Sequence, residues 1–254
     1  MIKSAILSSL ILFGLACSEG SEDTKPNKSV AEQVSESLPS GTTAEDQSEE
    51  LSIKYLALGD SYTIGESVEE DERWPLQLSN KMANINSNLI IEETKIIART
   101  GWTTQDLSSA LDKEELNSDY GLVSLLIGVN NQYRGYPIED YPGEFEKLLN
   151  RAVGFAGGNK NNVIVVSIPD YGYTPFGQSN QKKISEEIDT YNEINKRISE
   201  EIGIKYYYIT DISRKGLENP ELVAKDGLHP SGEQYQLWVE RIIADKEFQS
   251  IIEN

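Results

Sequence analysis

Five short apolar segments alternate along the chain with segments of helical periodicity. They cover residues 53–58, 89–97, 122–127, 163–168 and 205–209. Three of the five are nearly continuous apolar runs, which is typical of parallel strands covered on both faces. Because strands that alternate with helices form parallel sheets with right-handed crossovers, the sequence predicts an α/β fold, a three-layer α/β/α sandwich around a five-stranded parallel sheet.

The segments between these strands have the spacing of amphipathic helices. In residues 74–85, the apolar side chains of Trp74, Leu78 and Met82 recur every four residues and would share one face. The other predicted helices cover residues 103–116, 141–155, 182–202 and 231–248. The segment 89–97 is the most polar of the strand candidates, so we expect it at an edge of the sheet.

The first residues resemble a bacterial lipoprotein signal. Lys3 precedes an apolar run over residues 5–16, which is too short to span a bilayer but suits a secretory signal. The run ends at Cys17, the only cysteine, and the chain then becomes polar. The resemblance implies a signal peptide over residues 1–17 and a lipid on Cys17. Gly14 stands where such signals prefer leucine, and an ordinary signal peptide is the alternative.

Residues 18–50 are predicted to be a disordered acidic tether. They contain nine acidic residues and two lysines, hence a net charge of −7, and almost no large apolar side chains. The folded domain is then expected over residues 51–254. A lipid on Cys17 would anchor the protein to a membrane of the bacterial cell envelope, in the periplasm or at the surface.

Charge and rare residue types exclude several classes of function. The 254 residues carry a formal net charge of −19, which argues against nucleic acid or an anionic membrane surface as an electrostatic partner. A single cysteine cannot form an internal disulfide. A single histidine excludes a zinc site built from several histidines, so we expect no metal.

Ser61 is the candidate nucleophile, because it follows Gly59 and Asp60 where the first strand ends. His229 is the only histidine and so the only imidazole base, and Asp226, three residues earlier, could orient its ring. Each residue also has a plainer interpretation, as a capping serine, a surface histidine or a loop aspartate bonded to local amides.

Asn130 and Gly101 are candidate donors to a developing oxyanion. Asn130 follows the third strand and Gly101 follows the second. A side-chain amide or a backbone N–H can stabilise negative charge on a carbonyl oxygen. A turn asparagine and a loop glycine are the alternatives. Because the carboxyl ends of parallel strands share one rim, we expect these residues to lie near Ser61.

These stretches resemble, in their order, the sequence blocks of the GDSL/SGNH hydrolase family. The resemblance extends from about residue 53 to the C-terminus. The family's nucleophile, second-block glycine, oxyanion asparagine and Asp-x-x-His pair correspond to Ser61, Gly101, Asn130, Asp226 and His229. Two positions depart from the family pattern, Tyr62 in place of leucine and Asn131 in place of the aspartate of Gly-x-Asn-Asp.

The resemblance implies a flavodoxin-like α/β/α fold and a Ser–His–Asp triad. Ser61 would attack an ester carbonyl while His229 accepts its proton, and Asp226 would hold the ring. The backbone N–H groups of Ser61 and Gly101 and the amide of Asn130 would form the oxyanion hole. No metal or organic cofactor is implied. The change at Asn131 leaves the geometry of its loop and the substrate preference in question.

The substrate is less constrained than the reaction. Small-acyl or carbohydrate esters are favoured, and a lysophospholipase-like or thioesterase activity is the alternative. The alternative to an enzyme is a non-catalytic lipoprotein that binds to the cell envelope. The aromatic loop over residues 169–176 would line the site or pack its own rings, and Trp102 would stack on substrate or join the core. We expect a monomer.

Overall fold

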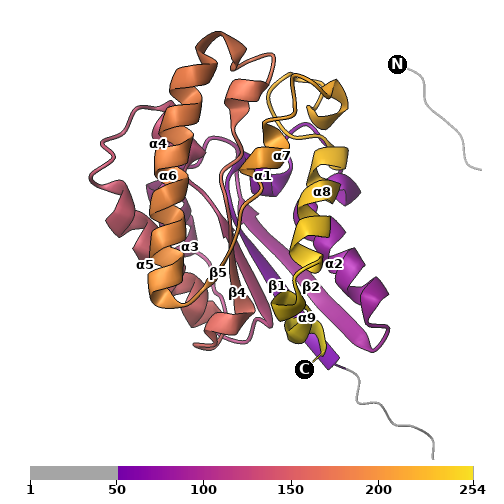
Figure 1. The fold of residues 1–254 in the computed structure, drawn as a ribbon. Coiled ribbons are helices and arrows are strands. Elements are labelled where there is room, and N and C mark those ends of the chain that lie inside the picture. Colours follow the sequence, from indigo (N-terminus) through magenta and orange to yellow (C-terminus); the bar gives the residue numbers. More distant parts are fainter. Residues whose placement is uncertain (1–50, 254) are drawn as a thin grey trace, which may run out of the picture. The chain divides into compact units, whose positions relative to one another are not determined.

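The apolar segments form the five strands of a parallel sheet in the computed structural model, which describes residues 51–253 (Figure 1). The strands are β1 (Leu51–Gly59), β2 (Leu89–Ala98), β3 (Leu122–Leu126), β4 (Val163–Val166) and β5 (Lys205–Tyr207). Their order across the sheet is β2-β1-β3-β4-β5. The predicted five-stranded α/β fold is confirmed, and β2 lies at an edge as its polar sequence indicates.

Helices cover both faces of this sheet (Figure 1). One layer contains α2 (Trp74–Ile85), α8 (Gly232–Ile243) and α9 (Lys246–Glu253), and the other contains α3 (Thr104–Leu111), α5 (Tyr141–Phe155) and α6 (Gln181–Ile202). Shorter helices follow individual strands, namely α1 (Ser61–Ile64), α4 (Val129–Tyr133) and α7 (Thr210–Ser213). Single 3-10 turns occur at Glu70–Glu72, Lys160–Asn162, Tyr171–Tyr173, Gln178–Asn180 and Pro220–Leu222.

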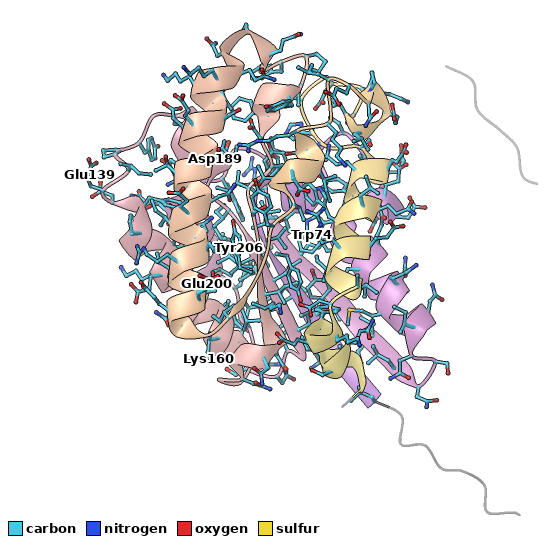
Figure 2. All side chains as sticks on the ribbon, viewed as in Figure 1. Trp74, Glu139, Lys160, Asp189, Glu200 and Tyr206 are labelled. Carbon is cyan, nitrogen blue, oxygen red and sulfur yellow. The ribbon has the colours of Figure 1, made fainter. Side chains whose placement is uncertain are left out.

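The core lies between the sheet and its two helical layers. Every residue of β3 and β4 is buried, whereas in β2 only Leu89 and Ile97 are buried and the other residues are partly or fully exposed. On the α2 and α8 side, Trp74 and Trp238 are fully buried, and Figure 2 shows Trp74 between the ribbons of that layer and the sheet. The apolar runs suit these strands because side chains on both faces of the sheet are removed from water, and each buried apolar side chain stabilises the fold.

Two predicted helices end earlier than expected. The helix predicted over residues 103–116 begins as expected, with Thr103 and Asp106 in a reciprocal capping box, but α3 ends at Leu111. The helix predicted over residues 231–248 is divided into α8 and α9. The cause is Asp245, which accepts the backbone N–H of Glu247 at 3.0 Å and so caps the start of α9.

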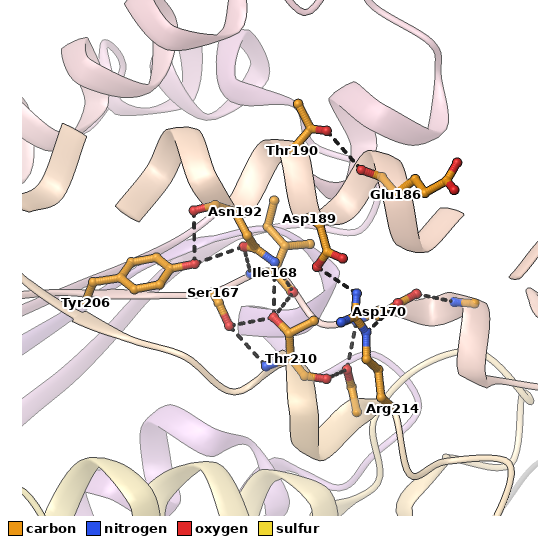
Figure 3. Close-up of polar contacts among 12 residues, drawn as sticks. Ser167, Ile168, Asp170, Glu186, Asp189, Thr190, Asn192, Tyr206, Thr210 and Arg214 are labelled. Atoms are coloured by element: carbon orange, nitrogen blue, oxygen red, sulfur yellow. Dashed lines mark hydrogen bonds and ion pairs between the residues drawn. The ribbon is translucent and has the colours of Figure 1, made fainter. Parts of the chain in front are cut away.

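The chain leaves β4 through a segment that is held by buried hydrogen bonds (Figure 3). Asn192 of α6 accepts the N–H of Ile168 at 2.8 Å and donates to its carbonyl oxygen at 2.9 Å. Asp170, fully buried, accepts the Nε–H of Arg214 at 2.9 Å. These contacts end the β4 ladder before residue 168, earlier than predicted, and fix the base of the loop that follows.

The predictions for the signal peptide, for Cys17 and for the tether over residues 18–50 lie outside the described residues. Between residues 51 and 253, no helix combines the length and the apolar character needed to cross a membrane.

Candidate active site

Ser61 lies at the carboxyl end of β1, on the first turn of α1. The turn needs glycine at position 59, since a Cβ there would lie 2.1 Å from Oγ1 of Thr63 and 2.5 Å from the carbonyl oxygen of Leu126. Asp60 caps α1 by accepting the N–H of Tyr62 at 3.1 Å. Ser61 is thus not the cap itself, and its hydroxyl makes no hydrogen bond within residues 51–253.

Four of the five predicted site residues line one cavity of about 290 Å³. They come from the ends of β1, β2 and β3 and from the loop before α8. The cavity is lined by Ser61, Tyr62, Thr100, Gly101, Val129, Asn130, Tyr133, Tyr171, Phe176, Leu228 and His229. The cavity lies at the carboxyl ends of β1 and β3, between which the strand order of the sheet reverses. This switch point is the usual ligand site of an open α/β sheet.

Asp226, the fifth residue, lies behind the imidazole. Its Oδ2 is 2.6 Å from Nδ1 of His229, and its Oδ1 accepts the backbone N–H groups of Leu228 and His229 at 2.9 and 3.0 Å. The Oγ–H of Ser67 also donates to Oδ2, at 2.7 Å. Burial opposes ionisation of Asp226, but these hydrogen bonds outweigh it and hold its pKa well below the usual range.

An ionised Asp226 determines the tautomer of His229. Because the carboxylate can only accept, Nδ1 of the imidazole carries a proton and donates it to Oδ2. Nε2 is then the basic nitrogen of the neutral ring, and the ring lines the same cavity as Ser61. The Tyr62 ring meets the imidazole edge-on, with centroids 5.8 Å apart. An imidazole that Asp226 holds in this way can accept a proton from a group in the cavity and return it.

Asp60 has the opposite surroundings. It is fully buried, and its Oδ2 has no hydrogen-bond partner among residues 51–253. Burial raises the pKa of Asp60 to about 7, and nearby backbone amides offset only part of that effect. Asp60 therefore supports the turn beneath Ser61 and does not face the cavity.

Three residues that line this cavity each carry an N–H group with a hydrogen left to donate. The amide of Asn130 gives one hydrogen to the carbonyl oxygen of Trp102 at 2.9 Å, which orients the group and leaves its second hydrogen available. Gly101 has φ of +85°, and its N–H is unpaired within residues 51–253. Ser61 begins a helix, so its N–H has no intrahelical acceptor. The geometry suits stabilisation of an oxyanion.

The contacts of Asn131 favour an amide over a carboxylate at this position. It is buried, accepts the N–H of Thr104 at 3.1 Å and donates to Oγ1 of Thr104 at 2.7 Å. The hydroxyl of Thr104 donates to Glu144, so it can only accept from residue 131. A side-chain amide fits this position and a carboxylate does not, because it would face Glu144. Asn131 joins α4 to α3 and does not line the cavity.

The structure also answers two questions about aromatic residues and adds two residues that sequence reasoning missed. The loop over residues 169–176 does line the cavity, through Tyr171 and Phe176, whereas Trp102 packs against the core.

Sequence reasoning missed Tyr133 and Ser67. Tyr133 lies one helical turn after Asn130, a spacing that could have identified it. No sequence pattern indicates the contact of Ser67 with Asp226.

Comparisons with known proteins give a family and a fold. The model of the GDSL-like lipase/acylhydrolase family matches residues 57–237. No curated protein sequence matches the chain. An acetyl xylan esterase from Geobacillus stearothermophilus is similar in structure, with a TM-score of 0.59, 17% identity and coverage of 79% of this chain and 97% of that chain.

Two further solved structures are similar to a comparable degree. A lipolytic protein of the G-D-S-L family from Veillonella parvula has a TM-score of 0.54 and 16% identity, covering 76% of this chain and 97% of that one. A psychrotrophic esterase from Pseudoalteromonas sp. has a TM-score of 0.53 and 19% identity, with coverage of 75% and 94%. At these identities the likeness establishes the fold.

Proposed function

The chain belongs to the GDSL-like lipase/acylhydrolase family and is therefore a carboxylic ester hydrolase, and on that premise we propose that Ser61, His229 and Asp226 are its catalytic triad. The observation that carries this proposal is the 2.6 Å contact between Asp226 and Nδ1 of His229, on a ring that shares a cavity with Ser61. This contact presents the basic Nε2 to the cavity, as a general base requires.

In the proposed mechanism, Oγ of Ser61 attacks the ester carbonyl carbon while Nε2 of His229 takes the hydroxyl proton. The tetrahedral intermediate places its negative oxygen among the donors of Ser61, Gly101 and Asn130. The imidazolium, stabilised by Asp226, returns the proton to the departing alcohol, which leaves an acyl-enzyme on Ser61. Water, deprotonated by His229, then attacks the acyl carbon and releases the acid.

We assign small-acyl esters, carbohydrate esters among them, as the substrates. The cavity beside Ser61 measures about 290 Å³, just below the range of roughly 300–1,000 Å³ that is typical of ligand pockets. Val129, Leu228 and Tyr62 give it an apolar lining that suits a short acyl group. The acetyl xylan esterase named among the similar structures supports this assignment at the level of substrate class.

The test of this function is hydrolysis of p-nitrophenyl esters from acetyl to palmitoyl. We expect an optimum at short chains, and turnover that is lost in Ser61→Ala and kept in Ser109→Ala, an exposed serine of α3. An optimum at long chains would replace the small-acyl assignment with a lipid hydrolase. A folded protein without turnover on any ester would favour a binding lipoprotein.

Lipid anchoring through Cys17 is a separate part of the proposal. The only cysteine follows an apolar segment and precedes a segment of net charge −7, which suits a lipidated N-terminus at the cell envelope. Cys17→Ser should release the protein from the membrane fraction and leave its esterase activity intact. A variant that stays with the membrane would show that the anchor lies elsewhere.

A further inference from the structure

A second hollow of about 510 Å³ adjoins the cavity beside Ser61. The two share three aromatic residues, Tyr133, Tyr171 and Phe176, which form a partition between them. The ring centroids of each pair lie 6.2 to 6.3 Å apart. A ligand that reaches from one space into the other must therefore pass over this aromatic partition.

The partition presents two of its three rings to solvent, and the third is held by hydrogen bonding beneath them. Tyr133 is 59% exposed and Phe176 is 51% exposed, among the largest exposures of apolar residues in the described part of the chain. Tyr171 is buried, and its hydroxyl donates to Oε1 of Gln132 at 3.0 Å. Asp170, at the start of the loop that carries Tyr171 and Phe176, accepts the Nε–H of Arg214 (Figure 3). Exposed aromatic rings at a fixed position suit stacking against a flat apolar face.

Beyond the partition, the hollow is lined by polar groups of both kinds. Gln132 donates from Nε2 to Glu187 at 2.6 Å, and Lys183 lies 3.7 Å from the same carboxylate. The polar lining consists of Gln132, Arg134, Asn180, Lys183 and Glu187. Such mixed donors and acceptors suit an uncharged ligand with many hydroxyl groups, and they do not suit an acyl chain.

We propose that this second hollow binds the sugar units of an acylated oligosaccharide while the ester lies at Ser61. A pyranose ring has an apolar face for Phe176 and Tyr133 and a rim of hydroxyls for the polar lining. The acyl group occupies the smaller cavity, and the alcohol side of the ester extends across the partition. This inference rests on the proposed esterase function and adds the substrate class of its leaving group.

The test compares esters with and without a sugar chain. Acetylated cello-, xylo-, manno- and chito-oligosaccharides of one to four units are assayed beside p-nitrophenyl acetate. For at least one series, we expect kcat/KM to rise with length up to two or three units. In Phe176→Ala, the ratio of kcat/KM for the best oligosaccharide to that for p-nitrophenyl acetate should fall about tenfold, mainly through KM.

Two lysines of α6 provide a matched control. Lys183 lines the hollow and pairs with Glu187, whereas Lys182 does not line it and pairs with Glu186 at 3.8 Å. Lys183→Ala should lower the same ratio by about threefold, the size of a weak polar contact, and Lys182→Ala should not lower it. If kcat/KM is independent of length in every series while Ser61-dependent hydrolysis of p-nitrophenyl acetate persists, the sugar subsite is wrong and the esterase stands. Loss of Ser61-dependent hydrolysis itself would overturn the esterase.

A second inference concerns Ser67, and it rests on separate observations. Ser67 has φ of 68°, and within residues 51–253 it is the only non-glycine residue with a positive φ. This conformation is unfavourable for an L-residue and needs compensation from a contact elsewhere in the fold. That contact is the 2.7 Å hydrogen bond to Oδ2 of Asp226, the same oxygen that accepts Nδ1 of His229.

We infer that Ser67 is a positioning residue for the ester hydrolysis, acting through Asp226. Its hydroxyl joins the segment that follows the nucleophile helix to the loop that carries the base. With the two amides on Oδ1 and Nδ1–H of His229, it makes four donors to the carboxylate, which hold it in one orientation toward the ring. Its donation also competes with Nδ1–H for Oδ2, which moderates the hydrogen bond to His229.

Ser67→Gly separates the hydroxyl from the backbone, because glycine keeps φ of 68° without strain. We expect kcat to fall about tenfold with KM unchanged, as for a contact that matters in the transition state. His229 is the only histidine, so its Nδ1 proton gives one low-field NMR signal, which should move further downfield when the competing donor is gone. Wild-type kcat together with an unmoved signal would overturn the inference.

Discussion

Asp60 and Asp226 both serve the region around Ser61, yet their surroundings move their pKa values in opposite directions. Asp60 follows β1 and caps α1, and burial raises its pKa to about 7. Asp226 lies on a loop where burial is outweighed by hydrogen bonds from His229, Ser67 and two amides, so its pKa is lowered. The difference arises from the number of donors and from access to water.

The comparison shows which of the two carboxylates can stabilise a positive charge on His229. Asp226 stays ionised through the neutral range and can stabilise an imidazolium, whereas Asp60 at neutral pH keeps much of its proton and supports a turn. Pairs of carboxylates whose surroundings separate their pKa values commonly divide roles in this way. The hydrogen-bond donors around a carboxylate therefore indicate its role better than its position next to Ser61 in the motif does.

The largest expected effects come from substitutions in the pair of Asp226 and His229. Asp226→Asn would favour the wrong tautomer of His229, so kcat should fall by about 10⁴, while His229→Ala should lower it by about 10⁶. Asp60→Asn should lower kcat less than Asp226→Asn, as measured by steady-state hydrolysis of p-nitrophenyl acetate. A larger loss in Asp60→Asn would reverse the roles assigned to the two carboxylates.

A third carboxylate, Asp170, extends the comparison to a buried group that has a cation. Asp170 is fully buried and accepts from Arg214 at 2.9 Å and from the N–H of Gly172 at 2.8 Å. Arg214→Met leaves this carboxylate without its partner and should lower the free energy of unfolding by about 3 kcal/mol in urea titrations. Arg197→Met, which removes an exposed pair with Glu201, should change it by about 0.5 kcal/mol or less. Equal effects would mean that burial does not govern these pairs.

Asp60 should also be visible in the pH dependence of stability. Its pKa in the folded protein, about 7, lies above the ordinary value of 3.8 that applies when the chain unfolds. Between these values the unfolded state releases a proton that the folded state keeps, so stability falls as pH rises from 4 to 7. In Asp60→Asn this decline should be smaller by roughly 3 kcal/mol, whereas exposed Asp71→Asn should reproduce the wild-type curve. An unchanged slope in Asp60→Asn would mean that Asp60 is ionised in the fold.

The smallest effect is expected from placing a carboxylate where the chain has an amide. Asn131→Asp would set a negative charge opposite Glu144 and remove the donor to Thr104, at a cost of about 1–2 kcal/mol in the free energy of unfolding. Asn150→Asp, on the exposed face of α5, serves as the control. Activity should survive, because Asn131 does not line the cavity. A stabilised Asn131→Asp would refute the hydrogen-bond assignment at Thr104.

The parts of the fold that were predictable are those that local patterns determine. The helices α2 and α5 match the predicted bounds because apolar spacing and a proline near each N-terminus coincide. The contact between Asp226 and His229 was expected because both residues belong to one short loop. The division between α8 and α9 was not, since Asp245 is held by Lys205 and Tyr207, which are distant in sequence. Ser67 was missed for the same reason.

The central claim is that Ser61 forms the acyl-enzyme, and a covalent trap tests it most directly. The protein is treated with a p-nitrophenyl phosphonate ester, and intact mass and peptide mapping locate the adduct. We predict one adduct per chain, on Ser61, with none in Ser61→Ala and much slower labelling in His229→Ala. An active enzyme whose adduct lies on another residue, or that still forms it in Ser61→Ala, would contradict this account.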